Sequence, residues 1–183
     1  MRYRMKSRLA EAPSRGFEYD FRNSFWGMTK ADVKLSERLY PLSESETHIT
    51  YKDKVMSLEA IVGFHFVDDS LIEAGYAFRE AYQERDLYML QYNRVKLMLT
   101  RIYGEPLIDK DISSPSEKKG CKVEPITEAE SLVFIVEWRN SRSIIRLLLV
   151  SDKSSTEFGV LHLSRDHNSS YKTVMNYAAR QEK

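Results

Sequence analysis

Residues 58–78, LEAIVGFHFVDDSLIEAGYAF, decide the fold, because they contain two alternating segments around a short polar turn. In each segment every second residue is apolar, which is the pattern of a β-strand with one buried face. Asp68 and Asp69 suit the turn, since aspartate side chains can hydrogen-bond their own backbone. We therefore predict a β-hairpin here. Its alternating apolar residues are Leu58, Ala60, Val62, Phe64, Phe66, Ile72, Ala74, Tyr76 and Phe78.

A short helix is predicted before this hairpin, over residues 30–39. Thr29 and Asp32 have the spacing of a capping box, in which the threonine oxygen accepts from the backbone N–H three residues on and Asp32 accepts from the threonine N–H. Pro41 ends the helix, because the residue before a proline disfavours helical geometry. Residues 47–51 are a further strand candidate.

The segment after the hairpin changes to a period between three and four, which is typical of an amphipathic helix. Gly104 is placed to form its left-handed C-cap, and Pro106 blocks its continuation. Alternation then returns, and strands are predicted over residues 131–139, 144–150 and 157–163. The apolar stripe of the helix comprises Tyr88, Tyr92, Val95, Leu99 and Ile102.

The order of helix, about three strands, helix and about three strands predicts an α+β fold. We expect two α-β-β-β units, over residues 21–80 and 84–165, within a single domain over 21–183. Side by side, the two units would form one antiparallel sheet with both helices packed on one face. The other face would be open to solvent or to a partner.

Three less regular segments are predicted outside this plan. Residues 1–20 form a basic arm that a proline and a glycine interrupt. Residues 105–130 contain three prolines and many polar residues, so we expect a mobile surface loop, with a binding lid as the alternative. Residues 171–183 offer a short packing helix. Its apolar stripe is Val174, Tyr177 and Ala178.

The composition is that of a globular chain. Of 183 residues 42% are hydrophobic and 30% charged, which excludes a wholly disordered protein. The net charge of +1 gives no field that favours nucleic acid, and no apolar run reaches the ~18 residues of a transmembrane helix. The N-terminus lacks the apolar core of a secretory signal. We expect a cytoplasmic protein as the sequence stands, or a periplasmic or envelope protein if a leader has been removed.

A resemblance to known proteins rests on residues 21–33, FRNSFWGMTKADV. Together with FVDD at 66–69, YGEP at 103–106 and EW at 137–138, this stretch resembles a group of bacterial α+β proteins of unassigned function that begin a helix with Trp-Gly-Met-Ser/Thr. The GMT of residues 27–29 is more distantly similar to the BamE (SmpA/OmlA) family, and the repeated helix-plus-strands plan to the β-lactamase-inhibitor-protein fold. The resemblance implies an envelope-associated binding protein without a catalytic centre.

No catalytic signature is found in the sequence: it has no phosphate loop, dinucleotide fingerprint, His-Glu-x-x-His motif or Gly-x-Ser-x-Gly motif. We therefore predict that the chain is not an enzyme and holds no cofactor. Cys121 lies near three lysines that favour a thiolate, but no orienting base is close in sequence, so an incidental or crosslinking thiol is predicted. The residues predicted to matter are structural anchors: Trp26, Thr29, Asp32, Gly104 and Trp138.

A metal site is the most specific alternative role for the histidines. His162, Asp166 and His167 could meet only if the chain turned sharply after Arg165, because strand spacing does not place both imidazoles on one face. We therefore predict no metal. The four histidines, His48, His65, His162 and His167, are predicted to be surface residues.

These observations lead us to expect a non-catalytic protein-interaction module that binds an unidentified protein through the open sheet face and the 105–130 loop. The alternative is a small-ligand carrier or sensor with a pocket between sheet and helices. LLLV at residues 147–150 is apolar on both strand faces, so something must cover it. A second copy, which gives a homodimer, and the segment from Tyr171, which gives a monomer, are both left open.

Overall fold

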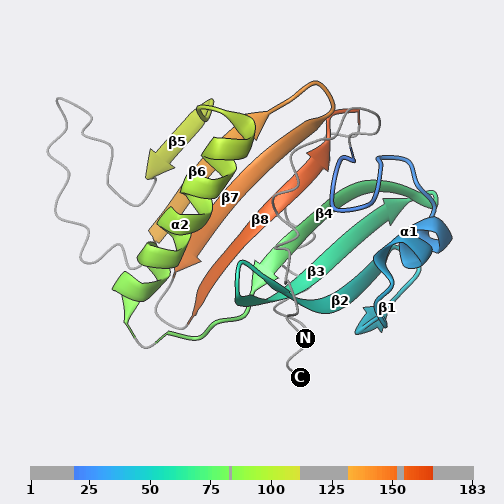
Figure 1. Cartoon of the computed structure of the whole chain (residues 1–183), viewed down its shortest axis with the longest axis horizontal. Helices are drawn as coiled ribbons and strands as arrows, with labels where there is room; N and C mark the ends of the chain where they lie inside the picture. The colour runs from blue at the N-terminus through green and yellow to red at the C-terminus, as the bar shows by residue number, and fades with distance from the viewer. Residues whose placement is uncertain (1–18, 83, 112–131, 152–154, 167–183) are drawn as a thin grey trace, which may run out of the picture.

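The computed structural model describes residues 19–82, 84–111, 132–151 and 155–166. Within these ranges the chain forms one eight-stranded antiparallel sheet and two helices (Figure 1). The elements are α1 (Lys30–Glu37), β1 (Ser43–Glu44), β2 (His48–Val55), β3 (Leu58–Val67), β4 (Ser70–Phe78), α2 (Arg85–Tyr103), β5 (Ile108–Asp111), β6 (Leu132–Arg139), β7 (Ser143–Ser151) and β8 (Thr156–Ser164).

The strand order is β1-β2-β3-β4-β8-β7-β6-β5. Each half of the chain therefore contributes four consecutive strands, and the halves meet where β4 pairs with β8. The predicted α+β fold of two α-β-β-β units is wrong. The structure is mostly sheet, its helices pack loosely, and each half gains a short edge strand, β1 or β5. Neither edge strand has the apolar alternation that reveals a strand in sequence.

The hairpin of β3 and β4 is confirmed. Its strands pair in register from Ala60 opposite Phe78 to Val67 opposite Ser70, with one irregularity after His65. The turn residues Asp68 and Asp69 have φ of 49° and 56°. Two positive φ values in a two-residue turn match the right-handed twist of the strands that it joins.

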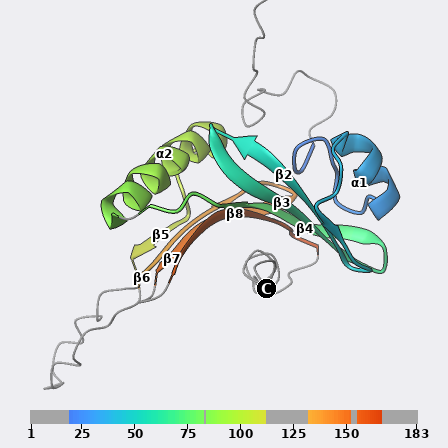
Figure 2. The same ribbon diagram turned by 90° about the horizontal axis from the view of Figure 1, so that it is seen from below.

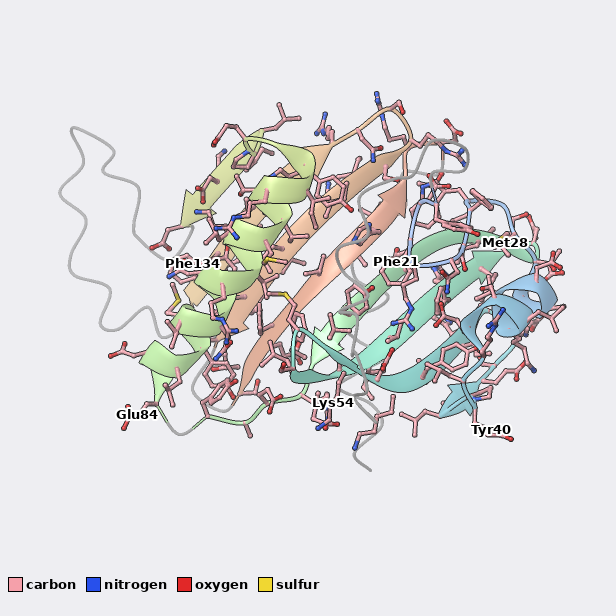
Figure 3. The ribbon with its side chains drawn as sticks, viewed as in Figure 1. Phe21, Met28, Tyr40, Lys54, Glu84 and Phe134 are labelled. Carbon is pink, nitrogen blue, oxygen red and sulfur yellow. The ribbon has the colours of Figure 1, made fainter. Side chains whose placement is uncertain are left out.

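The core lies between the sheet and the two helices, which both cover the same face (Figure 2). Phe134 of β6 lies under α2, 5.8 Å from the ring of Tyr92 (Figure 3). Val33 is the fully buried contact of α1. One row of paired residues crosses six strands on this face, all at most 4% exposed: Tyr51, Val62, Tyr76, Val160, Leu147 and Val136.

The two tryptophans tie other elements to this core. Trp138 is 1% exposed, and its Nε1–H donates to the carbonyl of Gly104 at 3.0 Å. Trp26 is half-buried and donates from Nε1 to the Ser143 hydroxyl at 2.9 Å. Each indole thus has a polar partner at its buried end.

The helix ends follow the capping pattern with two differences. The Thr29 oxygen accepts from the Asp32 N–H as predicted, but the Asp32 carboxylate accepts from the Thr29 hydroxyl at 2.7 Å. The helix stops at Glu37, because Arg38 is left-handed with φ 54° and ψ 26°. Gly104 has φ 83° and ψ −163°, a region that is essentially restricted to glycine and differs from the predicted left-handed helical cap.

Several predicted segments lie outside the described residues: residues 1–18 of the predicted 1–20 arm, Cys121 with most of the predicted loop, and the C-terminal segment 171–183. The beginning of that predicted loop is described, and there residues Ile108–Asp111 form β5. Neither described helix is long and apolar enough to cross a membrane.

Candidate functional site

The sheet face that points away from both helices is here called the outer face (Figure 2). On it, two cross-strand pairs of β6 and β7 lie side by side: Val133 opposite Val150, and Ile135 opposite Leu148. Leu148 is buried, Val133 and Ile135 are half-buried, and Val150 is 38% exposed. We call these four residues the β6/β7 patch.

The sequence of β7, SIIRLLLVS, explains the patch. Ile145, Leu147 and Leu149 pair with core residues of β6 and β8, so the residues between them point to the outer face. An antiparallel strand with one solvated face normally carries polar residues there. Leu148 and Val150 carry apolar side chains at these positions instead, and Val150 is 38% exposed.

A charged rim borders the patch. The carboxylate of Glu137, two residues after Ile135, accepts from Nε of Arg139 and from Nε of Arg146, both at 2.7 Å. Burial opposes ionisation of this carboxyl, but its hydrogen bonds from Arg146 and Arg139 outweigh that cost and hold the pKa of Glu137 below its ordinary value. The side chain of Arg139 is 48% exposed. Glu137 thus holds two arginines at the border of the patch, and we call these three residues its arginine rim.

A second cluster lies on the same face, over the other half of the sheet. His48, His65 and Glu73 face one another in register across β2, β3 and β4. The two imidazole rings stack, and Nδ1 of His48 lies 2.8 Å from the hydroxyl of Thr47. Burial and the charge of His65 lower the pKa of His48 to about 4, and burial lowers the pKa of His65. Among the described residues, no three His, Cys, Asp or Glu side chains have a geometry that could hold a metal ion.

The described structure does not bring His162 and Asp166 together, as the metal-site alternative requires. His162 belongs to the core face, 5% exposed, with its ring centroid 4.9 Å from that of Phe21. Asp166 is exposed after the end of β8, and His167 lies outside the described residues. The prediction of surface histidines is wrong for His48 and His162. Burial lowers the pKa of His162 to about 4, so the ring is neutral at pH 7 and packs as an aromatic side chain.

A buried ion pair supports the fold beneath α1. Arg22 contacts both carboxylate oxygens of Glu37, at 3.0 and 2.8 Å, and its side chain is 2% exposed against 0% for that of Glu37. The same guanidinium donates to Asp53 on β2 at 2.9 Å. The three residues are far apart in sequence, and no local pattern indicates their contact. The pair connects the segment before α1 to the helix and the sheet, and we assign it a structural role.

The anchors predicted from the sequence lie away from the β6/β7 patch, at helix ends and in the core. The sequence signal for the patch was the apolar run of residues 147–150, whereas the charged rim carries no recognisable motif. No family model, curated protein or solved structure matches this chain, so the resemblance to the Trp-Gly-Met-Ser/Thr group and to BamE stays a prediction.

Proposed function

We propose that the chain is a non-catalytic protein-interaction module that binds a partner protein through the β6/β7 patch and its arginine rim. The observation that carries the proposal is Val150, which is 38% exposed beside three other apolar side chains on a face without a described helix. In the sequence, the predicted 105–130 loop leads into β6 just before Val133. That loop is thus a second candidate contact region for the same partner.

The chemistry of the site favours an apolar segment with flanking acidic residues as the bound element. Apolar side chains at the centre and arginines near the edge are enriched in protein interfaces. The side chain of Arg139 is 48% exposed beside the Glu137 carboxylate, so an acidic group of the partner could approach it from solvent. These contacts would add association rate and specificity more than affinity.

The test is a capture experiment with three forms of the full chain: the wild type, Val150→Asp and Leu97→Asp. Both variants place an acid at an exposed apolar position, but Leu97 lies on α2 at 54% exposure, on the other side of the sheet. A protein retained by the wild type and by Leu97→Asp, but lost with Val150→Asp, is then purified and titrated against all three forms.

We expect the purified partner to bind the wild type and Leu97→Asp, and not to bind Val150→Asp. Equal binding of the purified partner by all three forms, or a loss only with Leu97→Asp, overturns it. Sedimentation of the same samples detects the case in which the partner is a second copy of the chain.

The alternative of a small-ligand carrier has less support. Its pocket was expected between the sheet and the helices. In that layer the ring centroid of Phe21 lies 5.5 Å from that of Phe64 and 4.9 Å from that of Tyr76 (Figure 3). These rings occupy the layer on the side of β3 and β4.

A further inference from the structure

Helix α2 has apolar residues on two opposite sides, whereas a helix on the surface of a sheet normally has one apolar stripe. Its inner side packs on β6 and β7 and buries Tyr92, Val95 and Leu99, each at most 3% exposed. On the opposite side, Leu90 and Leu97 are both 54% exposed. Figure 2 shows α2 as the outermost described element on its side of the sheet. The outer side of α2 therefore carries apolar surface that the described fold does not use.

The exposed leucines of α2 follow a heptad spacing. Leu87, Leu90 and Leu97 lie at i, i+3 and i+10, and all three are exposed. Arg94 and Arg101 occupy the two positions that complete the series, i+7 and i+14. Residues at alternating steps of three and four form one narrow line along a helix, which is the seam of a coiled coil. The line is about 21 Å long at 1.5 Å per residue. We call these five residues the α2 seam.

The two arginines of the α2 seam have no acidic partner in the part of the chain that the structure describes. Arg94 donates from Nη1 to the side-chain oxygen of Gln91 at 2.9 Å, which leaves its charge uncompensated. Arg101 forms no ion pair within the same ranges, and both arginines are exposed. By contrast, Lys96 on the same helix pairs with Asp109 at 2.5 Å. The α2 seam therefore combines apolar contact surface with two available positive charges.

We propose that the α2 seam binds an amphipathic helix of a partner protein, which has apolar residues along its own seam and acidic residues on both sides of it. In a coiled coil the positions that flank the seam carry the charges that select the partner. The side chains of Arg94 and Arg101 are long enough to lay their methylene groups along the apolar seam and bring the guanidinium to a flanking carboxylate. Charge complementarity thus specifies an acidic helix.

Two other occupants agree less well with the α2 seam. A second copy of the chain would bring four arginines together, two from each helix, with no carboxylate at any seam position. An anionic membrane surface takes up helices whose arginines lie on the polar side, opposite the apolar residues. In α2 the arginines share one line with the leucines. Spacing and charge together therefore favour a helix of a partner protein.

The inference goes beyond the proposed function, because α2 and the β6/β7 patch lie on opposite faces of the sheet (Figure 2). The partner sought for the patch is one that Leu97→Asp retains, so its binding does not depend on the α2 seam. Val150→Asp should in turn bind a helix at the α2 seam as the wild type does. Failure of one proposal therefore leaves the other intact.

The test uses two synthetic helical peptides of about three heptads, both with leucine at the seam positions. One peptide has glutamate at the flanking positions and the other has lysine. Fluorescence anisotropy measures the affinity of each peptide for the full chain as wild type, Arg94→Glu and Arg38→Glu. Arg38 is an exposed arginine at the end of α1, so Arg38→Glu is a control with the same change of charge.

We expect the wild type and Arg38→Glu to prefer the glutamate peptide by about tenfold or more, and Arg94→Glu to lose most of this preference. Because the preference is a ratio of two affinities for one protein sample, partial unfolding of a variant does not change it. Leu97→Asp should weaken binding of the glutamate peptide by about tenfold or more, and Val150→Asp should not. Equal affinities of the wild type for both peptides overturn the proposal, and so does a preference that Arg94→Glu retains in full.

Two further measurements without peptide test the other occupants. The wild type and Leu97→Asp are compared by sedimentation, and by flotation with vesicles of phosphatidylserine and phosphatidylcholine. We expect the two forms to behave alike in both experiments. Self-association that Leu97→Asp abolishes would identify a second copy as the occupant, and flotation that Leu97→Asp abolishes would identify a membrane surface. Either result overturns the proposal of a helical protein partner.

Discussion

His48 and His65 face each other across β2 and β3 with their ring centroids 4.3 Å apart and their planes inclined by 11°. Two imidazoles at this distance stack well when neutral and repel when both are charged. Burial first, and then the charge of His65, lower the pKa of His48 to about 4. The pair thus makes the outer face sensitive to acid.

Stability should fall as the pH decreases from about 6.5 toward 4. In this window the unfolded chain binds protons at His48 that the folded chain does not, so protonation favours unfolding. Above pH 6.5 the effect is absent. The slope for one such histidine is at most about 1.4 kcal/mol per pH unit. Urea denaturation of the wild type at pH 7.5, 6, 5 and 4.5 measures it.

His48→Gln is the matched variant for this prediction. Its unfolding free energy should depend less steeply on pH than that of the wild type. The pH dependence that remains should include a contribution from His162, whose pKa burial also lowers to about 4. A profile with the same slope in the wild type and in His48→Gln would show that the stacked pair does not titrate in this range.

Removing the carboxylate of Glu37 should cost about 3–5 kcal/mol of unfolding free energy, because the buried guanidinium of Arg22 then has lost its bidentate partner. Glu44→Ala is the control. Its carboxylate pairs with Lys34 at 2.7 Å near the surface, where solvent screening leaves an ion pair little effect on stability. Denaturant midpoints of Glu37→Ala and Glu44→Ala should differ clearly, and equal midpoints would disprove the structural role of the buried pair.

Thr29→Ala should lower the unfolding free energy by about 1 kcal/mol, since the first turn of α1 loses its side-chain acceptor. Thr29→Ser retains the hydroxyl and should behave nearly as the wild type. Both variants are compared by urea denaturation at pH 7.5. If Thr29→Ser destabilises as much as Thr29→Ala, the cap is not the cause.

Two glycine substitutions should act through different causes. A Cβ on Gly75 would lie 2.5 Å from the backbone oxygen of Val160, so Gly75→Ala must move β4 against β8. A Cβ on Gly104 meets nothing within 4 Å, and its φ of +83° alone makes Gly104→Ala cost about 1–3 kcal/mol. Amide chemical shifts should change along both strands for Gly75→Ala and only near the end of α2 for Gly104→Ala. If the amide shift changes stayed local in both variants, the close approach of Gly75 to Val160 would be contradicted.

Local patterns predicted the parts of this fold that depend on neighbours in sequence. The alternating apolar residues and the turn residues of the hairpin around Asp68 and Asp69 lie within 21 positions of the sequence. The structure contains both the paired strands and the turn. Strand β5 was missed because IDKD has no apolar alternation and forms a strand only by pairing with β6. That pairing crosses a long intervening segment, which no local pattern encodes.

The candidate site shows the same division. The apolar run of residues 147–150 indicated that a surface needed cover, but the pairing of Val150 with Val133 depends on register between strands. The buried Arg22–Glu37 pair joins residues 15 positions apart, and Glu37 would be assigned to a solvated helix face from sequence alone. Buried charge is therefore where sequence reasoning was weakest.

The ladder between β4 and β8, from Glu73 opposite Leu163 to Phe78 opposite Phe158, is the one place where the sheet passes from one half of the chain to the other. Residues 79–84 link the halves covalently. If two copies exchanged halves, β4 of each would meet β8 of the other through the same hydrogen bonds, and only this link would need a new path. The concentration during refolding, rather than any new contact, would then decide between a closed monomer and a strand-swapped dimer.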